Sequence, residues 1–493
     1  MRHWLGTSLR HVPNDFRVQE CYQQEVNWPI SYEDLSSWYG KAEHEIGVSA
    51  DVSEQQYLGI TFPPGYSYPM PKIPPSLVDT ATSAVNGMEF SGIPVSVTST
   101  PAGRNSQPYQ NRRVCAGNTN CIPICPIQAK YDPSVTLNQA LDTGNVEILS
   151  QTVATDIVID TNGRVSQINY CQYQDPGGPK TNSGSVTGKV FVVAAHAIET
   201  PTLLLRSKNQ GRLPNGVANS SLLVGKNLMD HPLYLAWALM PQPVFGYRGP
   251  LATSGIENLR DGKFRTEHAP FRIEIGNEGW NFSIGDPDTT TVDFINGLNK
   301  SGLNTGGSGG TPRALFGQSL VAALNHNLSR QFRLGFLVEQ SPETTNYVML
   351  STGKHEVDHL GFQRPEIHYD LSPYTKKGMV AAKKTADAIF SKLNATQFTT
   401  EPEADDPSSF EVDIDGKATR LKFFGSGHIV GTYCMGTAPG NSVVSSEQRS
   451  WDHPNLFLVG SGVFPTVATA NPTLTIAALS LWAADTILRK DLK

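Results

Sequence analysis

One apolar run constrains the fold more than any other feature of this chain. Residues 190–195, Val-Phe-Val-Val-Ala-Ala, contain no polar side chain, as expected for a strand that is buried on both faces of a covered sheet. Thr200 and Pro201 follow it and have the residue types of an N-cap and a first helical position. The resulting strand-turn-helix unit predicts an α/β (α+β) fold in which a helix N-terminus can meet a phosphate.

Length and charge narrow the class of the protein. With 493 residues the chain has room for two or three domains, which large α/β enzymes often interleave along the sequence. Its formal net charge is −6 and it has no long basic run, so nucleic acid is not an expected partner. No apolar stretch reaches the ~18 residues of a transmembrane segment, and residues 1–30 lack a signal-peptide pattern. We therefore expect a cytoplasmic protein, or one exported with the help of another chain.

Local patterns predict the elements around that unit. Ser31 and Asp34 have the spacing of a capping box, and the apolar positions after them predict a helix that ends near Gly47. Apolar steps of three and four residues predict another helix over 373–393, and residues 301–310 predict a glycine-rich loop. Alternating and β-branched residues predict strands at 92–100, 146–149, 154–160, 165–170, 233–240, 271–276, 331–339 and 347–351. The strands beyond residue 233 favour a separate layer that faces a substrate.

Three of the six cysteines lie within one short segment. Cys115, Cys121 and Cys125 are spaced by six and four positions, and a proline follows the last of them. This spacing favours an iron-sulfur cluster, in which turns aim several thiolates at one point. A zinc site, with a fourth ligand from Cys21, Cys171 or a histidine, and a disulfide between two of the three are the alternatives.

The C-terminal region offers one proton acceptor and one amide. His428 stands in Gly-Ser-Gly-His-Ile-Val-Gly, whose glycine spacing differs from that of a dinucleotide-binding loop. As a functional residue it would be a general base; a buried structural histidine is the simpler interpretation of a lone histidine. Asn471 and Pro472 begin an apolar helix and predict an N-cap and a first helical position. The same helix N-terminus could stabilise a flavin carbonyl or a developing negative charge.

Four motifs in order make the chain resemble the glucose-methanol-choline (GMC) oxidoreductases. They are residues 192–207, residues 224–232 (Val-Gly-Lys-Asn-Leu-Met-Asp-His-Pro), residues 428–432 (His-Ile-Val-Gly-Thr) and residues 463–476. The segment Cys-x5-Cys-x-Pro-x-Cys-Pro, followed by Ala-Lys-Tyr, further resembles the large subunit of bacterial membrane-bound dehydrogenases for sugars, polyols and gluconate. The resemblance extends over essentially the whole chain and is weakest in residues 240–420.

The resemblance implies a fold and a division into domains. The fold would be the two-domain GMC type, with an FAD-binding domain interleaved with a substrate domain built on an antiparallel sheet. Residues 1–25, 135–232 and 420–493 would form the FAD-binding domain, 26–134 a cap and iron-sulfur segment, and 233–419 the substrate domain. Members of the family begin with a βαβ unit of ~30 residues bearing Gly-x-Gly-x-x-Gly, which holds the FAD pyrophosphate. This unit is absent here, so the chain is an incomplete version, receives the unit from another chain, or has lost FAD binding.

The resemblance also implies roles for individual residues. His428 matches the catalytic histidine and Asn471 the second catalytic position, so that His428 accepts a hydroxyl proton while Asn471 holds the same oxygen. The cysteines at 115, 121 and 125 would hold a [3Fe-4S] cluster. The expected FAD-binding positions are His3, which has a covalently flavinylated counterpart in pyranose oxidases, with Ala154, Gly460, Ser461, Pro472 and Thr473.

The implied activity is oxidation of a hydroxyl of a sugar, polyol or sugar acid, by hydride transfer to FAD. Electrons would pass through the cluster to a cytochrome or an artificial acceptor. A small export-helper subunit and a cytochrome c subunit are the implied partners, and they would place the enzyme at the periplasmic face of the membrane. An oxidase that uses O2, and an inactive homologue without FAD, are the alternatives.

Overall fold

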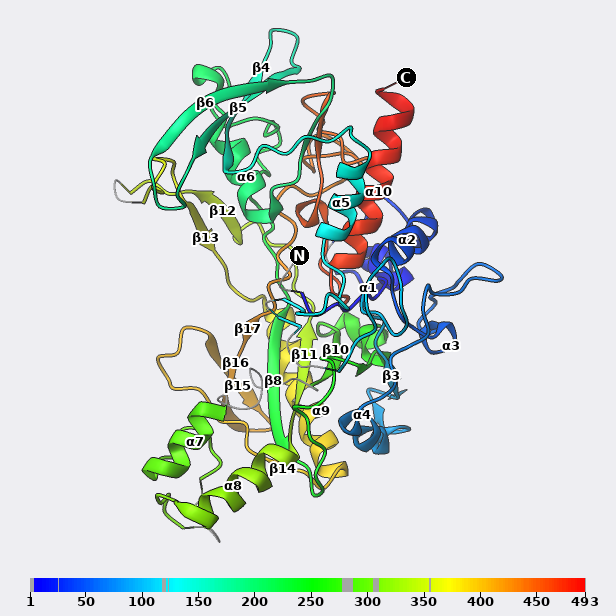
Figure 1. Cartoon of the computed structure of the whole chain (residues 1–493), viewed down its shortest axis with the longest axis vertical. Helices are drawn as coiled ribbons and strands as arrows, with labels where there is room; N and C mark the ends of the chain where they lie inside the picture. Colours follow the sequence, from blue (N-terminus) through cyan, green and yellow to red (C-terminus); the bar gives the residue numbers. More distant parts are fainter. Residues whose placement is uncertain are drawn as a thin grey trace.

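The protein divides into two halves along its longest axis, as the computed structural model shows (Figure 1). The structure describes residues 4–492 apart from 25, 118–120, 123, 277–286, 305–309 and 354–355. His3 and half of the expected glycine-rich loop therefore lie outside the described residues. Within them, no helix combines the length and the apolar character needed to cross a bilayer.

The upper half combines a parallel strand pair, an antiparallel sheet and three long helices, with shorter helices such as α5 (Ser134–Asp142) beside them (Figure 1). Strands β4 (Thr152–Ile159), β5 (Val165–Tyr173) and β6 (Lys180–Thr187) form the antiparallel sheet. Strands β7 (Phe191–Val193) and β18 (Leu456–Leu458) pair in parallel. The helices are α2 (Tyr32–Ile46), α6 (His196–Arg206) and α10 (Thr473–Lys490), of which α2 and α10 pack against each other.

The lower half is built on an antiparallel sheet that helix α9 (Pro373–Lys392) covers. The strand order is β14 (Thr396–Gln397), β8 (Pro232–Leu239), β11 (Gln331–Val338), β10 (Phe271–Gly276), β9 (Ser254–Ile256) and β3 (Val97–Ser99). Strand β17 (Phe424–Gly425) also pairs with β8. This sheet confirms the antiparallel layer predicted for the middle of the chain.

The remaining described elements connect and flank these layers. The helices are η1 (Pro13–Phe16), α1 (Val18–Tyr22), α3 (Val52–Gln55), α4 (Leu77–Thr82), η2 (Ser83–Val85), α5 (Ser134–Asp142), η3 (Asn209–Gly211), η4 (Asn258–Arg260), η5 (Lys263–Thr266), α7 (Pro287–Asn296), α8 (Gly317–Arg330) and η6 (Ser461–Val463). The strands are β1 (Glu89–Phe90), β2 (Ile93–Pro94), β12 (Tyr347–Leu350), β13 (Pro365–His368), β15 (Ser409–Ile414) and β16 (Lys417–Lys422).

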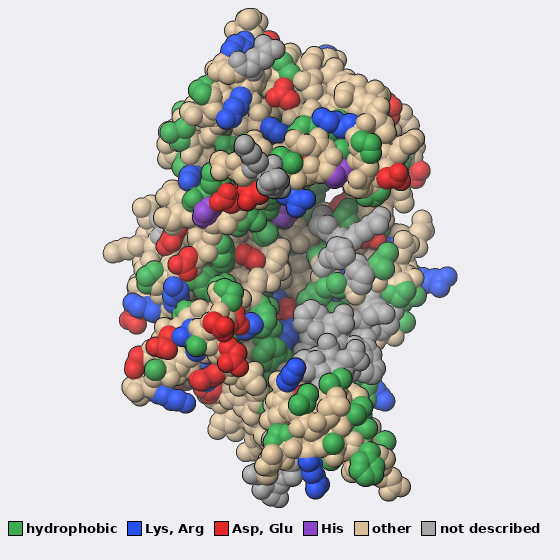
Figure 2. Space-filling view, turned by 90° about the vertical axis from the view of Figure 1, so that its left-hand side faces the viewer, with side chains coloured by type: hydrophobic (Ala, Val, Ile, Leu, Met, Phe, Trp, Pro, Cys, Tyr) green, Lys and Arg blue, Asp and Glu red, His purple; other side chains and the backbone are tan. Residues whose placement is uncertain are grey.

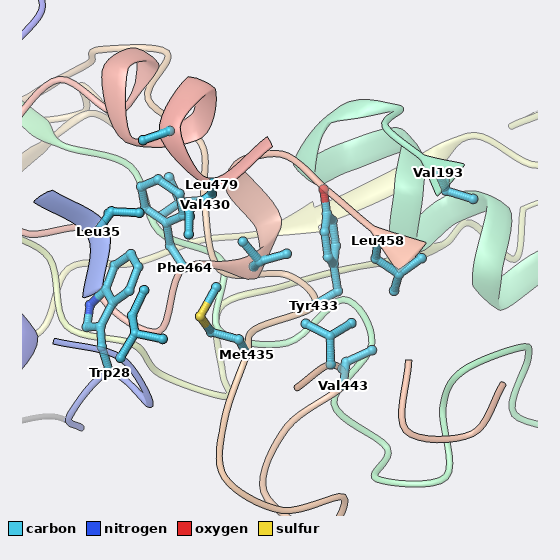
Figure 3. Packing of buried hydrophobic residues seen from close by; sticks show 14 of the residues in the cluster. Trp28, Leu35, Val193, Val430, Tyr433, Met435, Val443, Leu458, Phe464 and Leu479 are labelled. Atoms are coloured by element: carbon cyan, nitrogen blue, oxygen red, sulfur yellow. The ribbon is translucent and has the colours of Figure 1, made fainter. Parts of the chain in front are cut away.

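Each half has its own apolar core. The upper core gathers side chains from both ends of the chain, including Trp28 and Phe464, whose ring centroids lie 5.1 Å apart (Figure 3). Tyr433 lies across Gly462, where a Cβ atom would come within 2.0 Å of the tyrosine ring. The lower core packs α9 on β8 and β11. A hollow separates the two halves on the face shown in Figure 2.

Several predicted elements are confirmed. Helix α2 begins after Ser31, whose side chain accepts from the backbone N–H of Asp34, and it ends at Gly47 with φ +72°. This is the capping box and glycine C-cap that the sequence indicates. Strand β10 has the predicted bounds 271–276, and α9 spans most of 373–393.

The helix after β7 begins earlier than predicted. Helix α6 starts at His196, so Thr200 is not its N-cap and Pro201 lies inside the helix. A proline there leaves the carbonyl of Ala197 without its helical partner. The hydroxyl of Thr432 donates to that carbonyl at 2.6 Å, which explains how the helix tolerates the proline.

The apolar run and the strand predicted before it also differ from expectation. Strand β7 covers only residues 191–193, and Val192 is 48% exposed rather than buried on both faces. Residues 146–149 form no strand, and the whole run 141–151 is exposed. A strand needs a partner for its N–H and C=O groups, and within the described residues this run has no neighbouring strand.

Candidate functional site

The structure brings His428 and Asn471 together where the two halves meet. His428 follows β17 of the lower sheet, and Asn471 lies directly before helix α10 of the upper half. The amide nitrogen Nδ2 of Asn471 lies 3.3 Å from Nε2 of His428. The N-cap of α10 is Pro472 rather than Asn471, so the predicted helix start is wrong by one residue. The asparagine side chain is therefore free for a contact other than capping.

Arg272 fixes the orientation of the Asn471 amide. Its Nη1 donates to Oδ1 of Asn471 at 2.8 Å, and Arg272 is fully buried on β10. Because a guanidinium has no acceptor, the oxygen of the amide must face Arg272 and the NH2 group must face His428. Glu257 and Glu274 neutralise the buried arginine, with nearest atoms 3.1 and 3.5 Å away. Sequence reasoning missed Arg272 because an alternating strand gives no sign of which polar residue faces a site.

His231 lies on the other side of the candidate base. Its Nδ1 is 2.9 Å from Nδ1 of His428, and its Nε2 is 2.8 Å from the carbonyl oxygen of Ala468. His231 is fully buried directly before β8, and burial lowers its pKa to about 3. The sequence contained this residue in a recognised motif, Met-Asp-His-Pro, but gave no reason to place it against His428.

Burial also lowers the pKa of His428 well below its usual value, and His231 and Arg272 lower it further. The imidazole is therefore neutral at pH 7 and available to accept a proton. Asp230 holds the backbone of this segment: its carboxylate accepts from the N–H of His428 at 2.7 Å, of His231 at 2.8 Å and of Gly427 at 3.1 Å. Burial raises the pKa of Asp230 to about 6 despite these hydrogen bonds.

The other expected residues lie around the N-terminus of α10 or apart from it. Gly460 has φ +106°, and the hydroxyl of Ser461 donates to the carbonyl of Ile429 at 2.7 Å. No side chain caps α10, so the N–H groups of its first turn, beginning at Thr473, have no intrahelical or capping partner. Ala154 lies on β4, where its carbonyl accepts from Arg206 at 3.1 Å. Expected position His3 lies outside the described residues.

The cysteine segment sits beside two buried cations. All six cysteines are free, so the disulfide alternative is wrong. Arg104 is 1% exposed, and its Nε and Nη1 have no hydrogen-bond partner among the residues that the structure describes. Lys130 is 2% exposed and donates to the carbonyl of Trp4 at 2.6 Å. The pKa of Cys115 is raised because the thiol is buried, and the positive charge of Arg104 offsets part of this rise.

A ligand set for a metal is not preformed there. Among the described residues, no three His, Cys, Asp or Glu side chains converge closely enough to hold a metal ion. Cys121 and Cys125 are buried. Burial lowers the pKa of Lys130, and the two nearby thiols offset part of this shift. The donor types and the buried positive charges suit an anionic group held by thiolates.

Comparisons with known proteins agree with the resemblance seen in the sequence. Residues 84–233 match the N-terminal family model of the GMC oxidoreductases, and residues 342–480 match the C-terminal one. The chain is 33% identical to the fructose dehydrogenase large subunit of Gluconobacter japonicus over 492 residues, which cover 100% of this chain and 80% of that protein.

Two further comparisons extend this result. The 2-methyl-1,2-propanediol dehydrogenase of Mycolicibacterium austroafricanum is 26% identical, over 99% of this chain and 80% of that protein. Among solved structures, pyridoxine 4-oxidase from Mesorbium loti superposes with a TM-score of 0.58 at 17% identity, over 99% of this chain and 82% of that chain. The last likeness bears on the fold alone and confirms the α/β arrangement with antiparallel sheets.

Proposed function

Because this chain belongs to the GMC oxidoreductase family, we propose that it is an FAD-dependent dehydrogenase that oxidises a hydroxyl group of a sugar, a polyol or a sugar acid. Enzymes of this family act on CH–OH donors. Two relatives that match nearly the whole chain are, by name, dehydrogenases of fructose and of a diol, which supports this substrate class.

The pairing of His428 with Asn471 is the observation that carries the proposal. A substrate hydroxyl placed between Nε2 of His428 and the NH2 group of Asn471 would give its proton to the imidazole. The amide N–H would stabilise the negative charge that develops on the same oxygen. Asn471 enters the site with its orientation already set by Arg272, so no reorganisation is needed when the charge develops.

FAD, when bound, would supply the two-electron acceptor for the hydride that leaves the carbon. The uncapped first turn of α10, at Pro472 and Thr473, suits a flavin carbonyl oxygen because free N–H groups and the helix dipole point there. Gly460 and Ser461 would contribute from the segment whose Ser461 hydroxyl donates to the carbonyl of Ile429, next to His428, and Ala154 would contribute from β4. We assign residues 1–25, 135–232 and 420–493 to the FAD-binding domain, 26–134 to a cap and iron-sulfur segment, and 233–419 to the substrate domain.

The nucleotide half of FAD needs a phosphate-binding unit that the described residues do not contain. Within them, β7 pairs only with β18, and parallel strands normally belong to larger, covered sheets. The free edge of β7, beside the exposed Val192, is the position at which a βαβ unit would extend the sheet. We propose that FAD binding depends on such a unit at this edge.

A [3Fe-4S] cluster held by Cys115, Cys121 and Cys125 would supply one-electron transfer to an acceptor. Arg104 and Lys130 support this proposal, since both are buried beside the cysteines and buried cations favour a nearby anionic group. Among the described residues, Nε and Nη1 of Arg104 have no hydrogen-bond partner. The acceptor would be a cytochrome c subunit or an artificial dye. Together with a small export-helper subunit, this cytochrome would hold the enzyme at the periplasmic face of the membrane.

Turnover of a defined panel tests the proposal. The protein, purified together with the phosphate-binding unit proposed at the edge of β7 and with FAD added, is assayed with fructose, glucose, sorbitol and gluconate. A redox dye serves as one acceptor and O2 as a second. We expect dye reduction without matching peroxide. The variant His428→Gln should lose at least ~100-fold in kcat, because no base remains at that point. Peroxide formation equal to substrate loss would identify an oxidase, and absence of both flavin and turnover would identify an inactive homologue.

A further inference from the structure

We propose that His231 is a positioning residue that fixes the tautomer of His428, so that the nitrogen facing Asn471 carries no proton before the substrate arrives. The proposal rests on the proposed role of His428 as the base. It assigns a task to a residue that does not itself meet the substrate, because His231 is fully buried behind the ring of His428.

The carbonyl of Ala468 sets the tautomer of His231. A carbonyl oxygen only accepts, so the 2.8 Å contact with Nε2 of His231 requires that this nitrogen carry a proton. Burial disfavours a positive charge on the ring of His231, and the nearby Arg272 and Arg260 disfavour it further. Among the described residues, no carboxylate contacts the ring, whose nitrogen atoms face His428 and the carbonyl of Ala468. The ring is therefore neutral, and its Nδ1 has a lone pair.

The tautomer of His231 in turn sets the tautomer of His428. The two Nδ1 atoms lie 2.9 Å apart, and the ring planes are perpendicular, with centroids 5.1 Å apart. Since Nδ1 of His231 accepts, Nδ1 of His428 must donate. A neutral imidazole carries one proton, so Nε2 of His428 has a lone pair, and the NH2 group of Asn471 lies 3.3 Å from it. The hydrogen bonds then run in series from Ala468 through His231, His428 and Asn471 to Arg272, and each of them joins one donor to one acceptor.

The chain of bonds also stabilises the product of proton transfer. When the substrate proton moves to Nε2, His428 becomes an imidazolium that carries a proton on each nitrogen. The proton on Nδ1 continues to donate to His231, which keeps the ring in place while the positive charge forms. Without His231, the single proton of neutral His428 is free to occupy Nε2, and the ring can then no longer accept the substrate proton there.

Three variants test the assignment in the full chain with FAD. His231→Leu removes the acceptor, His231→Asn keeps an acceptor oxygen near the position of Nδ1, and His453→Asn is a control at another buried histidine, whose Nδ1 contacts the carbonyl of Gly163. A wrong tautomer costs a comparable catalytic histidine about 10⁴ in kcat. We expect His231→Leu to lose ~10²–10⁴ in kcat with little change in KM, His231→Asn to recover most of the loss, and His453→Asn to match the wild type.

The tautomer itself is read by 15N NMR of histidine-labelled protein, with His428 assigned from a His428→Gln spectrum. We expect Nδ1 of His428 to be protonated and Nε2 unprotonated in the wild type and in His231→Asn, with the proton moving to Nε2 in His231→Leu. A wild-type spectrum with Nε2 protonated would overturn the proposal, as would a folded His231→Leu protein with wild-type kcat. If His231→Leu does not fold, the wild-type and His231→Asn spectra still decide. An active His428→Gln enzyme would instead refute the proposed function. The two failures can be told apart because the NMR result does not depend on turnover.

Discussion

The amide of Asn471 is held by an arginine from the opposite half of the molecule, with Nη1 of Arg272 2.8 Å from Oδ1. Arg272 belongs to the sheet of the lower half, whereas Asn471 precedes a helix of the upper half. The reacting groups therefore depend on how the two halves are packed. Arg260 makes a second hydrogen bond to the segment before Asn471, because its Nε donates to the hydroxyl of Thr469 at 3.0 Å.

Replacement of Asn471 by aspartate should remove the donor and keep the contact with Arg272. The carboxylate would accept from the guanidinium but could not donate to the substrate oxygen. We expect kcat to fall by about 10²–10³, the cost of losing one donor to a developing negative charge. The matched variant Asn471→His keeps an N–H group and should lose less. Equal losses in the two variants, measured by steady-state kinetics, would contradict the role of the amide N–H.

The pH dependence of kcat/KM should follow Asp230 rather than His428. The pKa of His428 is held well below its usual value, so its titration should not appear near pH 6.5. The pKa of Asp230 is raised to about 6, so this carboxylate takes up a proton as the pH falls through 6. A protonated carboxyl is a weaker acceptor for the backbone N–H of His428. We expect kcat/KM to fall below pH 6 in the wild type and to be flat in that range, at a lower level, in Asp230→Asn.

The raised pKa of Asp230 also affects the stability of the protein. Its pH dependence is opposite to that of a carboxylate whose pKa is lowered by an ion pair. The folded state binds the Asp230 proton more tightly than the unfolded state does, so this group makes the protein less stable as pH rises from about 4 to 6. Thermal unfolding of the wild type and of Asp230→Asn between pH 4 and 7 checks this sign. A contribution of Asp230 that increases with pH over this range would show that its pKa is not raised.

A methyl group at Gly462 should destabilise the upper core. Its Cβ atom would meet the ring of Tyr433 at 2.0 Å, and the hydroxyl of Tyr433 donates to the carbonyl of Val459 at 3.0 Å, which limits movement of the ring. Overpacking of this kind costs about 1–3 kcal/mol. Gly440→Ala is the control, because a Cβ atom there meets nothing within 4 Å. Calorimetry should give a lower Tm for Gly462→Ala and an unchanged one for Gly440→Ala.

Loss of the buried charge at Arg104 should change the potential of a cluster held by the nearby cysteines. In the protein with its cluster assembled, Arg104→Met removes a positive charge from a low-dielectric region. The reduction potential should become more negative by on the order of 50 mV. A redox titration followed by EPR measures this shift. An unchanged potential in a protein with a complete cluster would show that Arg104 does not interact with it.

Local signals in the sequence predicted local structure well. Ser31, Asp34 and Gly47 fixed both ends of α2, because capping depends only on neighbouring residues. The start of α6 was wrong because the carbonyl left free by Pro201 is satisfied by Thr432, which lies far away in the sequence. The strand expected at 146–149 failed because strands require partners.

The candidate site was predictable only in part, because local motifs identify single residues but not contacts between layers. His428 and Asn471 came from motifs, and the structure places them 3.3 Å apart. Arg272 and His231 act through contacts across layers, which no spacing rule reveals. Their partners become visible only when the two halves are assembled.

The parallel pair of β7 and β18 has a consequence for the order in which the protein folds. Phe191 pairs with Leu456, more than half of the chain later, and the side chain of Asn455 bonds to the backbone of Val165 at 2.9 and 2.8 Å. During synthesis, β7 must therefore wait with an unpaired, partly apolar edge until almost the entire chain has left the ribosome. The upper half therefore cannot complete its sheet pairing until strand β18 has been synthesised.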